Sequence, residues 1–216
     1  MIKDLRAQKN LKLYIDLLEE VKSRVEFVSS SLESSADRFK IETNALQVRK
    51  VIELIAFALL SLHQSEYQKF RANSGRDFSK DWNGRDIITN VMKLNPDMFF
   101  RTSKGFVVQE DGTKQIQLEN LKNCYTLKQL TNLYKRCGGV LHVANPWSTS
   151  NKVNSFQAEL PSIIHKLRHT LNEHVVLVNH WCESESTAVI FTMGCSNMKP
   201  SYALATSLGN FQFSAA

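Results

Sequence analysis

The chain has 216 residues, 43% of them hydrophobic and 22% charged, so it is long enough to bury a core and too apolar to be disordered throughout. The four cysteines form no CxxC pair and lack the dense spacing of a disulfide framework, which indicates reduced thiols. The charged N-terminus excludes an apolar signal peptide, and the longest apolar run, Val51 to Leu62, is too short to cross a bilayer. We therefore expect a cytoplasmic protein that has no membrane segment.

The N-terminal third predicts two long helices. Apolar residues step by three and four along the first helix, as in a heptad seam that could pair with a helix of a partner protein; the seam comprises Leu11, Tyr14, Leu18, Val21, Val25, Val28 and Leu32. A Ser-rich connection leads to a second helix, from Thr43 to Arg71, which contains the run "VIELIAFALLSL". This run is apolar on nearly every face, which is typical of a helix in the middle of a bundle or in a subunit interface.

The central part of the chain has weaker patterns. A polar, Gly-containing loop precedes a short helix from Asp86 to Leu94, which the Asn95-Pro96 pair ends. Residues 99–120 have no regular period, and a small hairpin turning at Asp111-Gly112 is one interpretation of them.

The C-terminal part changes from helices to strands. Helices are predicted from Thr126 to Val143, ended by Asn145-Pro146, and from Gln157 to Leu171. The β-branched runs "HVVLVNHW" and "TAVIFTMG" then predict a hairpin, and the tail from residue 196 has no pattern. The expected fold is mainly α, with a helical bundle over residues 1–173, a small C-terminal β-hairpin over 174–195 and an irregular tail over 196–216.

The sequence has no P-loop, GxGxxG, GxSxG or HExxH motif, so the usual signatures of nucleotide hydrolysis, hydride transfer and zincin chemistry are missing. A histidine-rich stretch offers one candidate site. His165 and His169 are four residues apart on a predicted helix and could share a metal, with His174, His180 and Cys182 further along. No carboxylate lies between the first two histidines to act as a base, so we predict polar residues at a helix-to-strand junction and no metal site.

The second candidate is the stretch "YKRCGGVLHVANPW", in which Arg136 and His142 form an R-x5-H pattern at the end of a late helix. Seven Lys and Arg residues against two acidic ones surround it between Leu121 and His180, which favours a phosphate-bearing partner or forms a solvated basic face. Together with "RKVIELIAFALLSL", this stretch resembles the HEPN superfamily of small all-helical domains, whose active members are metal-independent ribonucleases with an R-x4-6-H motif. The resemblance covers Thr43 to Leu171.

The resemblance implies an HEPN-like bundle and an endoribonuclease that needs no metal or cofactor. Two copies of the motif would meet across a homodimer, with Arg136 and His142 catalytic and with Tyr134, Lys135 and Asn145 positioning the RNA. Histidine can exchange a proton near neutral pH, and arginine offers a planar fork of donors to a phosphate. A toxin or antiphage defence role would suit such an enzyme.

The sequence also departs from the family pattern. Cys137 follows the arginine where a polar residue is common, and Gly138 and Gly139 lie inside the motif. Residues six apart on a regular helix lie about 120° apart, so Arg136 and His142 converge only if the glycines bend the backbone or a second subunit supplies one of them. The alternative is a catalytically silent helical subunit that binds RNA or a partner protein.

Overall fold

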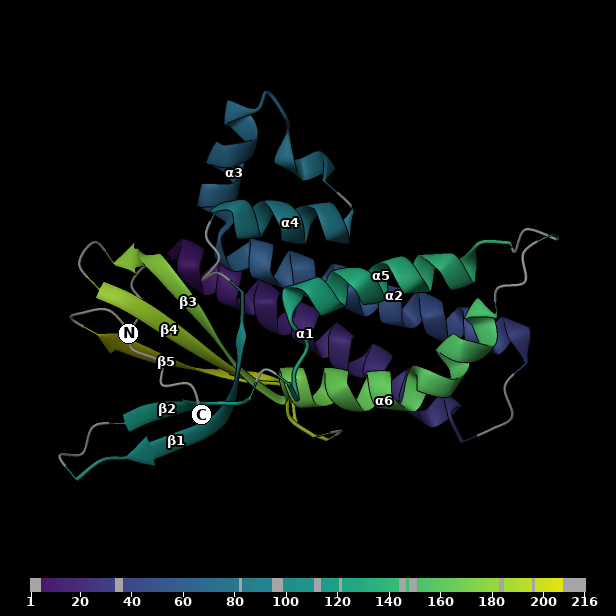
Figure 1. Ribbon diagram of the computed structural model, residues 1–216. Helices are drawn as coiled ribbons and strands as arrows, with labels where there is room; N and C mark the ends of the chain where they lie inside the picture. Colours follow the sequence, from purple (N-terminus) through teal and green to yellow (C-terminus); the bar gives the residue numbers. More distant parts are fainter. Residues whose placement is uncertain are drawn as a thin grey trace.

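Helices form most of the protein, and a sheet lies at one end of them (Figure 1). This computed structural model describes residues 5–33, 37–81, 83–94, 99–110, 114–120, 122–143, 147, 151–182, 185–195 and 197–207. The helices are α1 (Leu5–Ser31), α2 (Arg38–Leu62), α3 (Gln64–Asn73), α4 (Gly84–Leu94), α5 (Leu127–Leu141) and α6 (Lys152–Asn172), with a 3-10 turn at Phe78–Lys80. The strands are β1 (Arg101–Val108), β2 (Lys114–Leu118), β3 (Glu173–Cys182), β4 (Glu185–Thr192) and β5 (Ser201–Ser207). The expectation of a mainly helical protein is confirmed.

The first two helices form the centre of the bundle. The heptad seam of α1 is buried from Leu11 to Val28 and packs on α2, so the surface predicted to pair with a partner helix is occupied within the chain. The apolar run in α2 also lies in the core, as Val51, Ile52 and Leu59 are almost fully buried. Of the two places expected for this run, the structure puts it in the middle of the bundle.

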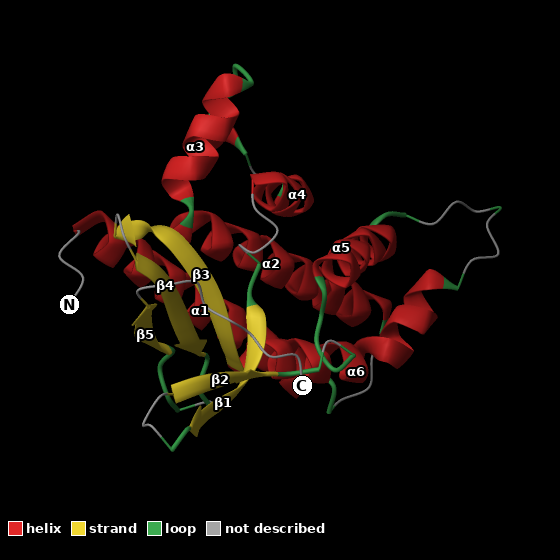
Figure 2. Cartoon of the chain, turned by 60° about the vertical axis from the view of Figure 1, so that its left-hand side comes forward, coloured by secondary structure: helices red, strands yellow, loops and turns green. Residues whose placement is uncertain are grey.

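The second predicted helix is two helices in the structure. Its apolar period runs on past Leu62, but the backbone leaves helical geometry at His63, with φ −116° and ψ 27°. His63 ends α2, and its carbonyl accepts the amide of Tyr67 in the first turn of α3. This break turns α3 away from the bundle axis (Figures 1 and 2).

The expected C-terminal hairpin is part of a larger antiparallel sheet, with the strand order β2-β1-β3-β4-β5. β3 and β4 pair as predicted, with Val176 opposite Val189. Beyond the hairpin, the central segment contributes β1 and β2, and β1 joins β3 where Arg101 and Thr102 meet the start of that strand. The turn predicted at Asp111-Gly112 lies outside the described residues. The strands on either side of that turn do form the small hairpin that was one interpretation of residues 99–120, since Val108 lies opposite Lys114. For the C-terminal part, a hairpin alone was the wrong prediction, because β3 and β4 belong to a five-stranded sheet.

The tail predicted to be irregular contains β5, which pairs along β4 from Thr192 to Ser186. The sheet is also joined to the bundle, because Val176, Val189 and Phe191 belong to the same hydrophobic core as α1 and α2. Within the described ranges, no helix has the length and apolar character needed to cross a membrane.

α5 and α6 lie side by side and run in opposite directions over the central helices (Figures 1 and 2). α5 begins with a capping box in which Thr126 accepts the amide of Gln129 and Gln129 accepts the amide of Thr126. α6 begins at Lys152, earlier than the predicted start at Gln157, and this first turn faces the end of α5. The two helices therefore place the R-x5-H stretch opposite the start of α6.

Candidate functional site

The R-x5-H stretch occupies the last turns of α5 and ends at its C-terminal cap. α5 is helical through Gly138 and Gly139, and neither glycine has a positive φ. A regular helix puts Arg136 and His142 about 120° apart around the axis and about 9 Å apart along it. The glycines therefore do not bend the chain to bring this pair together within one molecule.

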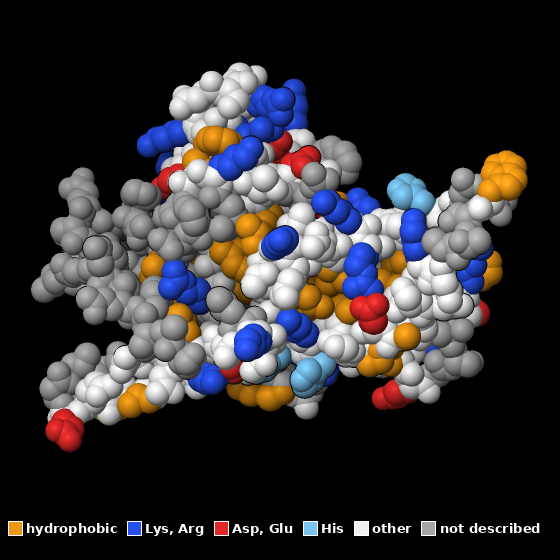
Figure 3. Space-filling model, viewed as in Figure 1, with side chains coloured by type: hydrophobic (Ala, Val, Ile, Leu, Met, Phe, Trp, Pro, Cys, Tyr) orange, Lys and Arg blue, Asp and Glu red, His pale blue; other side chains and the backbone are white. Residues whose placement is uncertain are grey.

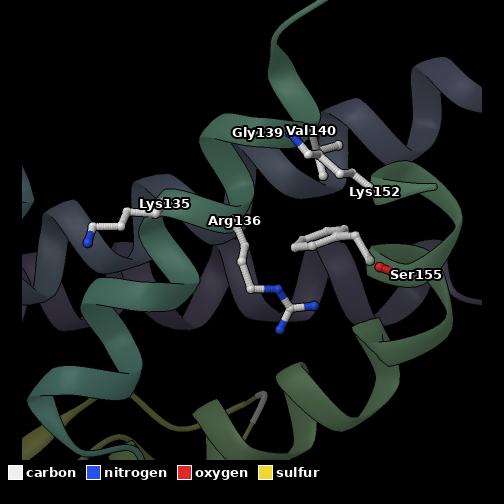
Figure 4. A pocket seen from close by; sticks show the side chains of 7 residues that line it. Lys135, Arg136, Gly139, Val140, Lys152 and Ser155 are labelled. Carbon is white, nitrogen blue, oxygen red and sulfur yellow. The ribbon is translucent and has the colours of Figure 1, made fainter. Parts of the chain in front are cut away.

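A pocket between α5 and α6, called here the α5–α6 pocket, has a volume of about 290 Å³. Its lining residues are Lys135, Arg136, Gly139, Val140, Lys152, Ser155 and Phe156. Arg136 points into the space between the helices, whereas Lys135 extends away along α5 (Figure 4). Ser155 and Lys152 approach from α6. Buried Val140 and Phe156 supply the apolar floor.

The α5–α6 pocket is electropositive. Its lining contains three cationic side chains, those of Lys135, Arg136 and Lys152, and no acid. The amides of the first turn of α6 add partial positive charge, and the N-cap residue Asn151 makes no side-chain capping hydrogen bond to them. Figure 3 shows Lys and Arg side chains gathered on the face that carries α5 and α6. This arrangement suits an anion.

The acid nearest to Arg136 is Glu159, whose Oε1 lies 2.9 Å from Nη2 of Arg136. The Arg136 and Glu159 side chains are 42% and 52% exposed, so water screens the pair. Exposed ion pairs of this kind contribute about 0–1 kcal/mol. A phosphate could therefore replace Glu159 as the partner of the guanidinium at little cost.

His142 is the C-cap residue of α5, and its amide donates to the carbonyl of Gly138 at 3.2 Å. Its side chain is exposed, so the imidazole can exchange protons with solvent or with a bound substrate. The pocket reaches Gly139 and Val140, which lie within the last turn before His142. His142 is therefore near the end of the pocket but on another side of the helix from Arg136.

Tyr134, predicted to position RNA, is buried on the side of α5 that faces α2. Its hydroxyl donates to Oε1 of Glu53 at 3.0 Å and accepts from Nη2 of Arg49 at 2.8 Å. The Arg49 guanidinium also lies over the phenol ring, 4.4 Å from its centroid. Burial, and then the neighbouring Glu53 carboxylate, raise the pKa of Tyr134, so the phenol stays protonated. We call Arg49, Glu53 and Tyr134 the Arg49 cluster.

Asn145 and Cys137 are two further residues of the R-x5-H stretch. Asn145, also predicted to position RNA, lies outside the described residues. Cys137 is fully buried, and this burial raises the pKa of its thiol to about 12. A thiol that stays protonated at neutral pH is a poor nucleophile. Cys137 therefore packs α5 against the core.

The first three histidines of the histidine-rich stretch are dispersed in the structure, and the side chains of His180 and Cys182 lie outside the described part. His165 is exposed on α6, and His169 faces the Glu119 carboxylate with 3.3 Å between Nε2 and Oε2. His174 is buried beside Tyr14, whose hydroxyl contacts its Nε2 at 2.7 Å. Nowhere in the described ranges do three or more His, Cys, Asp or Glu side chains gather as metal ligands.

Sequence reasoning missed the α6 side of the pocket and the Arg49 cluster. Lys152 and Ser155 precede Gln157, where the helix was predicted to begin, so their contribution depended on the earlier start of α6. Arg49 and Glu53 had a visible signal, because they are oppositely charged residues four apart at the edge of the apolar run of α2.

Comparison of the chain with models of known protein families gave no match, and neither did comparison with curated proteins or with solved structures.

Proposed function

We propose that the protein is a metal-independent endoribonuclease of the HEPN type, acting as a homodimer. The observation that carries the proposal is the α5–α6 pocket, which is lined by Lys135, Arg136 and Lys152 and lies beside the first turn of α6. A phosphodiester fits this combination of cations and helix amides. An exposed histidine at the end of the same helix supplies a group that can move a proton.

In the proposed reaction, the 2′-oxygen of a ribose attacks the adjacent phosphorus and the bond to the 5′-oxygen breaks. His142 takes the proton from the 2′-hydroxyl and passes it to the leaving 5′-oxygen, and Arg136 holds the extra negative charge on the phosphate oxygens. The products are a 2′,3′-cyclic phosphate and a 5′-hydroxyl, so no redox partner is consumed and no water is needed in this step.

A second copy of the chain completes the site in this proposal. Because α5 stays helical through its glycine pair, His142 of one copy would act on a phosphate held by Arg136 of the other. A two-fold axis would create two such composite sites. A toxin or antiphage defence role is the biological setting in which we would look for this activity.

The test is cleavage of a labelled single-stranded RNA by purified protein in EDTA, with the ends identified by mass. We expect 2′,3′-cyclic phosphate ends from the wild type and none from Arg136→Ala or His142→Ala. Lys128→Ala is the matched control, since Lys128 is an exposed cation of α5 that lies outside the pocket lining. Activity that is lost on chelation, or that survives both alanine variants, would overturn the mechanism.

Mixing the two inactive variants tests the composite site. After unfolding and refolding together, Arg136→Ala and His142→Ala chains form mixed dimers in which one of the two sites has both residues. About one quarter of the wild-type activity should return, because half of the dimers are mixed and half of their sites are intact. If wild type is active and the mixture stays inactive, the site is not shared between subunits.

The alternative is a catalytically silent subunit that binds RNA or a partner protein. The observation that favours it is the pairing of Arg136 with Glu159 while His142 lies on another side of α5. Under this alternative, the wild type binds RNA in a salt-dependent manner but leaves it intact, and Arg136→Ala weakens binding whereas His142→Ala does not.

A further inference from the structure

The Arg49 cluster joins the middle of α2 to α5 and holds its arginine in a fixed position. Nε of Arg49 donates to Oε1 of Glu53 at 3.3 Å, and Nη2 donates to the hydroxyl of Tyr134 at 2.8 Å. On its other side, Glu53 packs against Gly84 at the start of α4. This contact is so close that a Cβ at position 84 would come within 3.0 Å of the Glu53 Cα. The guanidinium is therefore positioned before any ligand arrives.

The contacts leave the outer edge of this guanidinium available. Arginine has five N–H donors, of which the Arg49 cluster uses one on Nε and one on Nη2. Among the described residues, no acceptor contacts Nη1, and the side chain is 26% exposed. Glu53 and Tyr134 use the hydrogen of Nε and one hydrogen of Nη2. The remaining hydrogens of Nη1 and Nη2 form a pair of donors of the kind that binds a phosphate in a bidentate manner.

Gly138 is buried and has no side chain, which lets the Arg49 guanidinium pack closely against α5. A Cβ at position 138 would lie 3.3 Å from Nη1 of Arg49, closer than side-chain atoms normally approach. His142 follows Gly138 by four residues, so the two positions lie on nearly the same side of α5, about 40° apart. Within one chain, Arg49 is therefore the arginine on the side of α5 that carries His142, whereas Arg136 faces α6.

We propose that Arg49 binds a second phosphate of a single-stranded RNA, on the α2 side of α5, next to the phosphate that is cleaved. This inference rests on the proposed ribonuclease function and adds a binding residue to it. The strand would pass the end of α5, with one phosphate in the α5–α6 pocket of one subunit and its neighbour on Arg49 of the subunit that supplies His142. Glu53 and Tyr134 position the guanidinium and do not touch RNA.

The experiment compares wild type with Arg49→Lys, Arg49→Gln and Gly138→Ala. Binding is measured by fluorescence anisotropy with a single-stranded RNA whose 2′-positions are methylated, so that it cannot be cleaved, and cleavage is measured with the unmodified RNA. We expect Arg49→Gln to weaken binding about 10- to 100-fold and Arg49→Lys about 10-fold, because a charged hydrogen-bonded contact is lost or reduced. The slope of log K against log salt should fall by about 0.7 for Arg49→Gln, the value for one phosphate of a single strand.

Gly138→Ala tests the position of Arg49 without removing it. Alanine is a better helix former than glycine, so α5 should remain folded while the new methyl group displaces the guanidinium edge. We expect weaker RNA binding with an unchanged or raised melting temperature. Arg38→Gln is the matched control, because Arg38 and Glu42 form the same i,i+4 pair in the first turns of α2, with 2.9 Å between Nε and Oε1, and Arg38 is exposed.

The outcomes separate this inference from the proposed function. If wild type binds and cleaves RNA, while Arg49→Gln and Gly138→Ala bind with unchanged affinity and salt slope, Arg49 only joins α2 to α5 and the inference is wrong. If wild type neither binds nor cleaves RNA, the proposed function itself fails. If the Arg49 variants lose binding only together with their thermal melt, and Gly138→Ala binds normally, the cluster is structural and the inference is again wrong.

Discussion

The imidazole of His174 should make the stability of the protein depend on pH in the mildly acidic range. His174 has no exposed surface; its Nδ1 donates to the carbonyl of Leu171 at 3.0 Å, and its Nε2 accepts from the hydroxyl of Tyr14 at 2.7 Å. These contacts fit the neutral ring. Burial lowers the pKa of His174 from 6.5 to about 4.

The sign of the effect follows from proton uptake. Below pH 6.5 the unfolded chain binds a proton at His174 and the folded chain does not, so the free energy of unfolding falls as the pH falls. The contribution is fully present above pH 6.5 and is lost progressively down to about pH 4. At 1.36 kcal/mol per pKa unit, the total loss is about 3 kcal/mol, and about 2 kcal/mol of it is lost by pH 5.

Urea unfolding followed by far-UV circular dichroism at pH 7.5, 6.5, 5.5 and 5 measures this term. His174→Gln keeps a neutral hydrogen-bonding side chain but cannot take up the proton, so its stability should change less with pH than that of the wild type, by about 2 kcal/mol at pH 5. His165→Gln is the control, since that histidine is exposed on α6. Parallel pH curves for wild type and His174→Gln would refute the reasoning.

Two further substitutions test contacts outside the candidate site, both by urea unfolding at pH 7.5. Gly194→Ala should lower the free energy of unfolding by about 1–3 kcal/mol, because φ is +76° and the new Cβ would lie 3.1 Å from the Cβ of Met198; a neutral effect would mean that this turn is not fixed. Asp81→Ala should cost about 3 kcal/mol, since it removes the acceptor of the Tyr67 hydroxyl and the ion partner of the largely buried Arg71. A loss below 1 kcal/mol would show that water replaces the carboxylate.

Helix positions could be predicted where burial repeats along the chain. The seam of α1 and the apolar run of α2 are read correctly because each buried residue is one step in a local period. The end of α2 at His63 could not be read in this way, because no Gly or Pro interrupts the chain between Leu62 and Ser74. A backbone break of this kind depends on where α3 packs, which no local pattern encodes.

The sheet was underestimated for a different reason. β5 contains small residues that are mostly exposed, and it is held by backbone pairing with β4. β1 reaches β3 through only two residue pairs, at Arg101 and Thr102, more than 70 positions before their partners. Edge strands and long-range pairs carry little side-chain pattern, so sequence reasoning finds the two local hairpins and misses β5 and the pairing of β1 with β3.

In the candidate site, too, the local pattern could be predicted and the long-range contacts could not. The R-x5-H stretch is visible in the sequence, but the cations that accompany it come from α6 and α2, at positions 152 and 49. These cations contribute only because helix packing brings α2 and α6 against α5. The local signal in the sequence is the pair of charged residues Arg49 and Glu53 beside the apolar run of α2, from which a functional hypothesis could start.

A bend at the glycine pair of α5 was one of two ways in which Arg136 and His142 could converge, and the helix stays regular there. The contacts of the two glycines give another reason for the pair. Adjacent residues on a helix point about 100° apart. A Cβ at Gly138 would meet Arg49 Nη1 at 3.3 Å, on the α2 side, and one at Gly139 would lie 3.8 Å from the Lys152 side chain, on the α6 side. Each glycine costs α5 about 1 kcal/mol relative to alanine. The missing side chains let Arg49 and Lys152 pack close to the two flanks of α5, which places a cation on each side of the helix end that an RNA strand would cross in the proposed function.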